Sequence, residues 1–216
     1  MSKTIDKLQF IQKLRDNLTI MVGGFMTVGT PELLIDWVVE SNVKNLTIIC
    51  NDAGYPEHGV GKLIQNNQVK TLIASHIGLN PVAGVKMSQG DLEVILVPQG
   101  TLAEQIRAFG AGLGGILTPT GVNTVVEKEK QIITVNNTPY LLETSLGADL
   151  ALILAHQSDR LGNLTYDKTA RNFNPVMATA ATTVVAVVTT MVDFIDPEII
   201  VTPHIFIDDI VIKAGD

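Results

Sequence analysis

Short, continuously apolar runs recur along the first half of the chain, separated by amphipathic stretches. Residues 20–22 form such a run, which is typical of a strand covered on both faces of a sheet. Three further buried strands are predicted from the same pattern, at residues 45–50, 70–74 and 91–97. Residues 4–16 instead carry apolar side chains at roughly helical spacing, so they predict an amphipathic helix.

Two helix starts can be assigned from capping residues. Thr30 is a suitable N-cap, and Pro31 suits the first helical position after it. Thr101 is followed three residues later by Glu104, which is the pattern of a capping box. With a short helix near residues 59–65, strands and helices alternate, and this order predicts a parallel sheet with helices on both faces. The binding crevice of such a sheet lies at the carboxyl ends of its strands.

The second half of the chain is richer in β-structure. A hairpin is predicted around Asn136-Asn137, and further strands are predicted at residues 150–155, 183–189, 199–203 and 205–212. Residues 176–192 carry no charge, but five threonines interrupt them, which favours a buried strand over a membrane span. Residues 1–216 are therefore expected to form one α/β domain, with a mainly parallel open sheet, helices on both faces and a C-terminal β-rich portion.

Composition narrows the partners and the compartment. The formal net charge of −7 argues against nucleic acid and anionic membranes as partners, so an anionic substrate needs a local cradle. The single cysteine, Cys50, excludes a disulfide framework within the chain. The N-terminal residues have scattered charges and no apolar core, which does not fit a signal peptide. The sequence therefore predicts a cytoplasmic location.

Gly23 and Gly24 separate the first strand from the first long helix. Glycines leave backbone N–H groups uncovered by side chains, and a helix N-terminus favours negative charge. The turn is therefore a candidate cradle for an anion or an acyl oxygen. The alternative is a plain connection between strand and helix, as found in any α/β protein.

Polar side chains follow three of the other predicted strands. Gln99 comes after residues 91–97 and precedes a helix, so its amide is expected to project into the crevice and hold a carboxylate or carbonyl. Asn51 and Asn80 occupy similar positions after the second and third strands. For Gln99, the alternative is a turn residue that hydrogen-bonds its own loop.

The other motifs in the sequence do not support a cofactor, metal or hydrolase site. Residues 110–115 match the spelling G-x-G-x-x-G, but a helix precedes them, which is the reverse of the dinucleotide-binding context. No two histidines have metal-ligand spacing, so no metal site is predicted. Cys50 ends a buried strand and is expected to be inert. No G-x-S-x-G sequence is present to support a hydrolase triad.

Several segments together resemble one enzyme family. Residues 16–31 read DNxxIMVGGFxxxGxP, which resembles a signature of the alpha subunits of family I coenzyme A-transferases. Further segments resemble the same family, at residues 97–107, 117–121, 148–153, 162–164, 169–175 and 200–203. Residues 74–81 resemble the short-chain, acetate- or acetoacetate-type members. Two positions depart from family patterns: Leu79 where fused-chain members have Glu, and His204 where Gly is usual.

The resemblance implies transfer of coenzyme A between an acyl-CoA and a free carboxylic acid, through a glutamyl-CoA thioester on a beta subunit. It implies no catalytic nucleophile in this chain, no tightly bound cofactor, and an α2β2 or similar assembly. It also implies that a coenzyme A-binding loop is formed by Gly24, Phe25, Met26, Thr27, Val28, Gly29 and Thr30. The amides of this loop are expected to hold the thioester oxygen as negative charge develops.

Glu143 is the best internal candidate for the carboxylate nucleophile that such chemistry needs, because it lies near the end of a predicted strand. The favoured interpretation is nevertheless structural, as an ion-pairing group beside Arg107 or Arg171. Two other functions stay open. One is a ligand-sensing domain that binds a sugar phosphate or acyl-CoA without turnover, and the other is a self-sufficient hydrolase or isomerase that uses Glu143.

Overall fold

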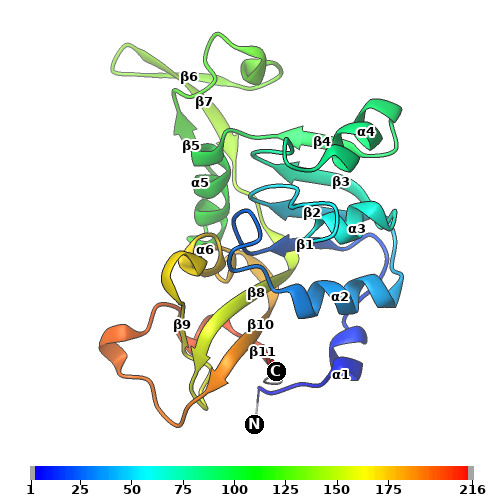
Figure 1. Cartoon of the computed structure of the whole chain (residues 1–216). Helices are drawn as coiled ribbons and strands as arrows, with labels where there is room; N and C mark the ends of the chain where they lie inside the picture. The colour runs from blue at the N-terminus through cyan, green and yellow to red at the C-terminus, as the bar shows by residue number, and fades with distance from the viewer. Residues whose placement is uncertain (1–2, 214–216) are drawn as a thin grey trace.

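The computed structural model describes residues 3–213, and its main feature is an eight-stranded sheet (Figure 1). Seven strands run in the order β11-β10-β8-β1-β2-β3-β4, with every neighbouring pair parallel, and β9 pairs antiparallel with β8. The strands are β1 (Thr19–Val22), β2 (Leu46–Cys50), β3 (Val69–Ala74), β4 (Glu93–Leu96), β8 (Ala148–Ser158), β9 (Leu164–Thr165), β10 (Ala181–Met191) and β11 (Asp209–Ile212).

Helices cover both faces of this sheet, as predicted. The α-helices are α1 (Lys7–Ile11), α2 (Glu32–Ser41), α3 (Gly61–Gln65), α4 (Pro81–Gln89), α5 (Gln99–Gly110) and α6 (Asn174–Met177). Ile20 and Val22 of β1 belong to the apolar core that also contains buried residues of α2 and α3. Met21, which points to the opposite face, belongs to a second core with residues of α5 and α6. The continuous apolar run in β1 thus reflects burial on both sides.

A small antiparallel sheet projects from one end of the main sheet (Figure 1). It has the order β5-β7-β6, with β5 (Gly115–Thr118), β6 (Ile132–Val135) and β7 (Thr138–Thr144). Asn136 and Asn137 join β6 to β7, both with positive φ, which confirms the predicted hairpin. The remaining short elements are the 3-10 turns η1 (Val125–Glu127), η2 (Lys168–Arg171), η3 (Pro197–Ile199) and η4 (His204–Phe206).

Both predicted helix starts were wrong, because a proline and not the expected threonine occupies each N-cap position. The N-cap of α2 is Pro31, and Thr30 makes no side-chain cap for it. Helix α5 begins directly after Pro98, so Thr101 lies inside the helix and forms no capping box, while Glu104 pairs with Arg107. Proline fixes a backbone angle that suits a helix start. Helix α2 therefore starts after Pro31 without a side-chain cap, and α5 starts after Pro98, before the expected cap Thr101.

Three predictions of extent or burial were wrong. The helix expected over residues 4–16 covers only α1, and before it Ile5 donates its backbone N–H to the carbonyl oxygen of Ile210 in β11. Strand β4 was expected to be buried, but it is the last strand of the sheet, and Ile95 and Leu96 are 43% and 52% exposed. Residues 199–203 form no strand beyond a single bridge between Thr202 and Leu164.

Residues 176–192, weighed above as a membrane span, divide between the end of α6 and the buried strand β10. Within residues 3–213, no helix has the length and apolar character needed to cross a bilayer.

Candidate functional site

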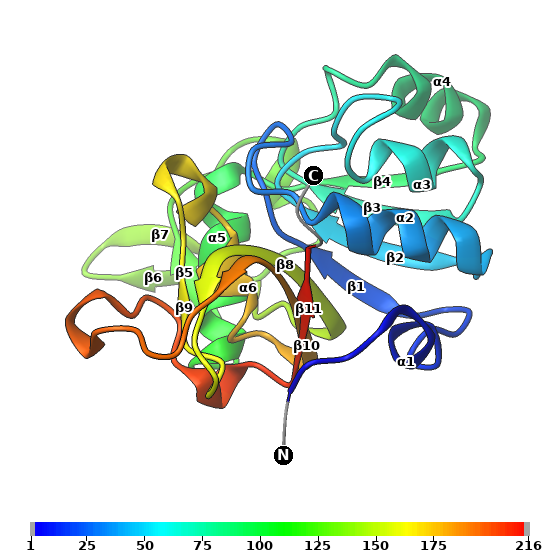
Figure 2. The same cartoon turned by 60° about the horizontal axis from the view of Figure 1, so that its bottom comes forward.

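The glycine loop, residues 23–30, connects the carboxyl end of β1 to α2. Strand β1 lies between β2 and β8. From β1 the chain continues through β2, β3 and β4 on one side, and the later strands β8, β10 and β11 fill the other side (Figure 2). This is the point at which the strand order reverses, which is where open α/β sheets bind ligands. The topology therefore places the predicted loop at the expected position of a site.

The tip of the glycine loop is a tight two-residue turn. Phe25 and Val28 exchange two backbone hydrogen bonds, of 3.0 and 2.9 Å. The two residues between them, Met26 and Thr27, have φ values of 45° and 67°. Left-handed backbone is rare for a β-branched residue such as Thr27 and costs about 1–3 kcal/mol, so the surrounding structure must hold it in place.

Asp52 holds the loop from the β2 side. Its Oδ2 atom accepts the backbone N–H of Met26 at 2.8 Å and the side-chain amide of Asn51 at 2.7 Å. Its Oδ1 atom accepts the backbone N–H of Gly54 at 2.9 Å. The carboxylate is buried and both of its oxygens accept hydrogen bonds, so Asp52 fixes the loop tip against the end of β2.

Two asparagines hold the loop from the other side. Asn172 Nδ2 donates to the carbonyl oxygen of Val28 at 2.9 Å. Asn174 is fully buried in α6, and its Nδ2 donates to the carbonyl oxygen of Gly29 at 2.9 Å. Its Oδ1 accepts the backbone N–H of Leu154 in β8 at 3.0 Å. The sequence did not single out Asp52, Asn172 or Asn174 as site residues, although Asn172 and Asn174 lie in the family-like segment 169–175 and Asp52 directly follows Asn51.

These anchors leave some loop amides free. The N–H groups of Phe25, Met26, Val28 and Thr30 are bonded within the chain. The other three loop residues after Gly23 are Gly24, Thr27 and Gly29. Their backbone N–H groups make no hydrogen bond with any residue that the structure describes. Unbonded amides on a held loop can receive an oxygen that carries negative charge.

Two hollows adjoin the glycine loop. One, of about 10 Å³, lies between the loop and the end of β2 and is lined by residues that include Gly24, Thr27, Cys50 and Asn51. It has room for about one water-sized group. The other, which we call the outer cavity, measures about 840 Å³ and is lined by Phe25, Met26, Val28, Thr169, Arg171 and Asn172. Its size is within the range of small-molecule sites.

The three predicted polar residues have different surroundings. Asn51 lies against the glycine loop, where it bonds Asp52. Asn80 is buried, caps α4 by accepting the Ala83 N–H, and donates to the carbonyl oxygen of Ala53 at 2.9 Å. Gln99 is exposed at the start of α5, after β4, and its side chain bonds no residue in the described part of the chain. In the sheet order, β2 and β3 separate β4 from β1, so Gln99 is not in contact with the loop.

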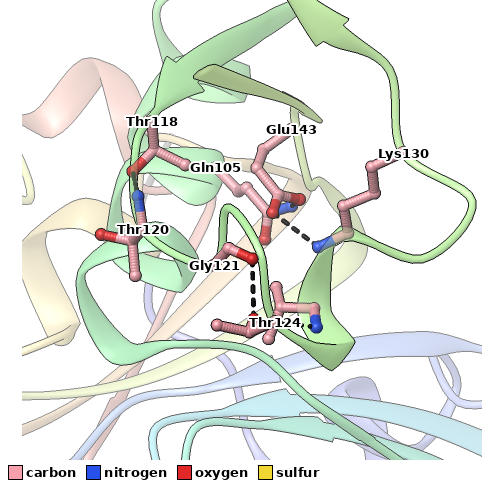
Figure 3. Close-up of polar contacts among 8 residues, drawn as sticks. Gln105, Thr118, Thr120, Gly121, Thr124, Lys130 and Glu143 are labelled. Atoms are coloured by element: carbon pink, nitrogen blue, oxygen red, sulfur yellow. Dashed lines mark hydrogen bonds and ion pairs between the residues drawn. The ribbon is translucent and has the colours of Figure 1, made fainter. Parts of the chain in front are cut away.

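Glu143 forms a buried ion pair, as the favoured interpretation expected, but with a different partner. It lies in β7, is 4% exposed, and pairs with Lys130 Nζ at 2.6 Å (Figure 3). Its other oxygen accepts Gln105 Nε2 at 3.2 Å. Arg107, one expected partner, pairs with Glu104 instead. Figure 3 also shows that the neighbouring turn is closed by Thr124 Oγ1, which donates to the carbonyl oxygen of Gly121 at 2.7 Å.

Neither Cys50 nor a cluster of acidic and histidine side chains forms a second centre within residues 3–213. Burial, and then the charge of nearby Asp52, raise the pKa of the Cys50 thiol well above its usual value, so the thiol is protonated. Among residues 3–213, no three His, Cys, Asp or Glu side chains are grouped so that they could hold a metal ion.

A parallel sheet with an anchored glycine loop at its switch point defines an α/β protein whose candidate site is this loop. Comparison with known families makes the class explicit: residues 8–213 match the coenzyme A transferase family, and the chain belongs to that family.

Individual relatives are similar over most of their length. The chain is 54% identical to the acetate CoA-transferase subunit alpha of Escherichia coli K12 over 92% of this chain and 91% of the relative. It is 53% identical to the acetoacetyl-CoA:acetate/butyrate CoA transferase alpha subunit of Clostridium acetobutylicum, over 91% of each chain.

A solved structure has the same fold. The acyl-CoA transferase of E. coli O157:H7, in a thioester complex with CoA, superimposes with a TM-score of 0.89 at 22% identity. The match covers 100% of this chain but only 48% of the solved one, so this chain spans about half of that length.

Proposed function

We propose that the chain is the alpha subunit of a heteromeric CoA-transferase. It moves coenzyme A between a short-chain acyl-CoA, such as acetyl-, acetoacetyl- or butyryl-CoA, and a free carboxylic acid. The observation that carries this proposal is the 54% identity to an acetate CoA-transferase alpha subunit over 91% of that subunit's length. The half-length match to the solved acyl-CoA transferase supports a second chain that completes the enzyme.

The nucleophile is supplied by the partner beta subunit in this proposal. A glutamate carboxylate attacks the thioester carbonyl, which releases CoA thiolate and leaves an acyl–glutamyl anhydride. The thiolate then attacks the glutamyl carbonyl, which releases the donor acid and leaves an enzyme–CoA thioester. The acceptor carboxylate reverses both steps. The engagement of Glu143 by Lys130 and Gln105, away from the glycine loop, supports a nucleophile on the partner.

This chain contributes the cradle for the thioester. Residues Gly24–Thr30 form the coenzyme A-binding loop, and the free amides of Gly24, Thr27 and Gly29 receive the carbonyl oxygen as it becomes negative. Each such donor contributes about 2.7–4 kcal/mol in known oxyanion holes. The hollow of about 10 Å³ beside Gly24 and Asn51 is suited to a single oxygen atom.

Gln99 orients the acyl or acceptor carboxylate in this proposal, because its amide is exposed and unengaged at the end of a strand. Asn51 contacts the substrate from within the loop hollow, whereas Asn80 supports the site through Ala53. Coenzyme A is a substrate and forms a covalent intermediate. The alpha subunit is a single domain (residues 1–216) that assembles with the beta subunit into a hetero-oligomer. The enzyme works in the cytoplasm and needs no nucleic acid, membrane or metal.

The direct test is a transfer assay with acetyl-CoA and either butyrate or acetoacetate. It is run with this chain alone, with the beta subunit alone and with both. We expect turnover only in the mixture, and mass spectrometry should find a CoA adduct on the partner and none on this chain. Turnover by this chain alone contradicts the proposal. Tight acyl-CoA binding without turnover in the mixture supports a sensor instead.

A further inference from the structure

Arg171 is unlike the other three arginines of the chain. Arg15, Arg107 and Arg160 each have a carboxylate partner, at 3.7, 2.7 and 2.6 Å respectively. Arg171 is exposed and makes no ion pair with any residue from 3 to 213. In a chain of net charge −7, an arginine left without a carboxylate is available to an anionic ligand.

The position of Arg171 is also distinctive, because it lines the outer cavity beside the glycine loop. One wall of this cavity consists of Phe25, Met26 and Val28, which are between 38% and 49% exposed. The other wall is η2 and Asn172, and the bond from Asn172 Nδ2 to the Val28 carbonyl oxygen joins the two walls. The cavity is thus mainly apolar, with one guanidinium group in its lining.

A second cation lies in the same 3-10 turn. A further hollow, of about 400 Å³, shares Arg171 and is also lined by Lys168 and Tyr166. Lys168 is exposed, and its contact with the neighbouring Asp167 carboxylate is long, at 3.7 Å. The two hollows meet at Arg171, so a ligand that extends out of the apolar cavity passes both positive groups.

We propose that Arg171, with Lys168, binds the phosphate groups of coenzyme A, and that the outer cavity receives the pantetheine arm. This inference rests on the proposed function. The free amides of the glycine loop hold the thioester end, and Phe25, Met26 and Val28 contact the arm. The planar guanidinium donates two parallel N–H hydrogen bonds to phosphate oxygens, a geometry that lysine cannot reproduce.

The test compares two thioesters in the assembled enzyme, acetyl-CoA and acetyl-pantetheine, which lacks every phosphate. R171E should lower kcat/KM for acetyl-CoA by about 10- to 100-fold, the loss expected for charge-assisted hydrogen bonds. The same variant should leave kcat/KM for acetyl-pantetheine within about twofold, because this thioester carries no phosphate for Arg171 to bind and an exposed charge without a partner is worth little. R171K should lie between wild type and R171E with acetyl-CoA. An acetyl-dephospho-CoA arm assigns the contact to the pyrophosphate if the loss persists, or to the 3′-phosphate if it disappears.

K70E is the matched control, since it makes the same charge change at the amino end of β3, opposite the carboxyl end of the sheet. K70E should leave kcat/KM unchanged for both acetyl-CoA and acetyl-pantetheine. An equal effect of R171E on the two thioesters overturns the inference, and so does no effect on either. Loss of copurification of the partner with R171E also overturns it and assigns Arg171 to the subunit interface. Failure of the wild-type mixture to transfer CoA from acetyl-CoA instead overturns the proposed function.

Discussion

The carboxylate of Asp52 accepts the backbone N–H of Met26 at 2.8 Å, which links the ends of two neighbouring strands. This contact follows from the parallel register in which Val22 lies beside Cys50, because residues just beyond each strand then face one another. Met26 is in the left-handed region, so the contact also helps to hold an unfavourable backbone conformation.

Removal of the Asp52 carboxylate should therefore loosen the loop. D52A leaves the buried N–H of Gly54 and the partly buried N–H of Met26 without their acceptor, and a buried unsatisfied group costs about 1–3 kcal/mol. We expect a lower melting temperature and reduced turnover in the assembled enzyme. D91A, at an exposed position before β4, is the control. Unchanged turnover in D52A is incompatible with a role for Asp52 in positioning the loop.

Gly24 should tolerate no side chain. Its φ is +116°, and an added Cβ would lie 2.2 Å from Thr30 Oγ1, so G24A must displace the loop. We expect loss of most transfer activity. Gly84, inside α4, has nothing within 4 Å of its added Cβ, so G84A should stabilise the protein by about 0.5–1 kcal/mol with unaltered turnover. Thermal unfolding and the transfer assay distinguish the two, and equal effects would refute the argument.

Gln99 should act on carboxylate substrates without any part in the fold. Its side chain is exposed and unengaged, so Q99A should not change the melting temperature. We expect a higher KM for the acceptor acid in Q99A, and a larger rise in Q99E because like charges repel. The measurement is acceptor-dependent turnover of the mixed subunits. If both variants match wild type across butyrate and acetoacetate, Gln99 has no substrate role.

Glu143 should matter for stability and not for chemistry. K130M leaves the buried Glu143 carboxylate without its cation, which costs about 3–5 kcal/mol. The double variant K130M/E143L removes both charges and should recover most of that loss. We expect E143Q to keep turnover within about twofold of wild type, because the Glu143 carboxylate serves as an ion-pair partner and not as the nucleophile. Abolished turnover in a folded E143Q enzyme would make Glu143 catalytic.

Asp159 should give the protein a specific acid sensitivity. Burial alone raises the pKa of Asp159, but hydrogen bonds from the Asn163 side chain and from the Asn163, Gly162 and Leu161 amides outweigh it and lower that pKa below its usual 3.8. A lowered folded-state pKa stabilises the protein above the unfolded value, and this contribution is lost as pH falls through the folded pKa. D159N should thus be less stable than wild type at pH 7, with the difference shrinking below pH 3.8. Unfolding measured at both pH values, with D91N as control, checks this, and a constant difference contradicts it.

The fold was largely predictable because its strands are apolar on both faces. Ile20, Met21 and Val22 leave no alternating pattern, and this indicated a covered parallel strand before any topology was known. The same signal misled at Ile95 and Leu96, which are as apolar as a central strand but lie at an edge. Composition reports side-chain character, whereas the edge position depends on how distant strands are ordered.

The turn between strand and helix was predictable, but the contacts that hold it were not. Gly23 and Gly24 marked the turn between strand and helix, and the switch point now places that turn in the sheet. The anchors Asp52 and Asn174 lie 26 and 145 residues from their partners Met26 and Gly29 along the chain. Such contacts arise from tertiary packing, which no local propensity encodes. The switch from Arg107 to Lys130 as the partner of Glu143 has the same cause.

The strand order also has a consequence for synthesis on the ribosome. Strand β1 ends at residue 22 and can pair with β2 once residue 50 has emerged, but its other neighbour, β8, begins at residue 148, a further 126 residues beyond β1. At about 5–20 residues per second, the growing chain carries an open, apolar strand edge beside the glycine loop for roughly 6–25 seconds. The seam where the site forms is thus closed late in translation, and until then it is exposed to pairing with other nascent chains.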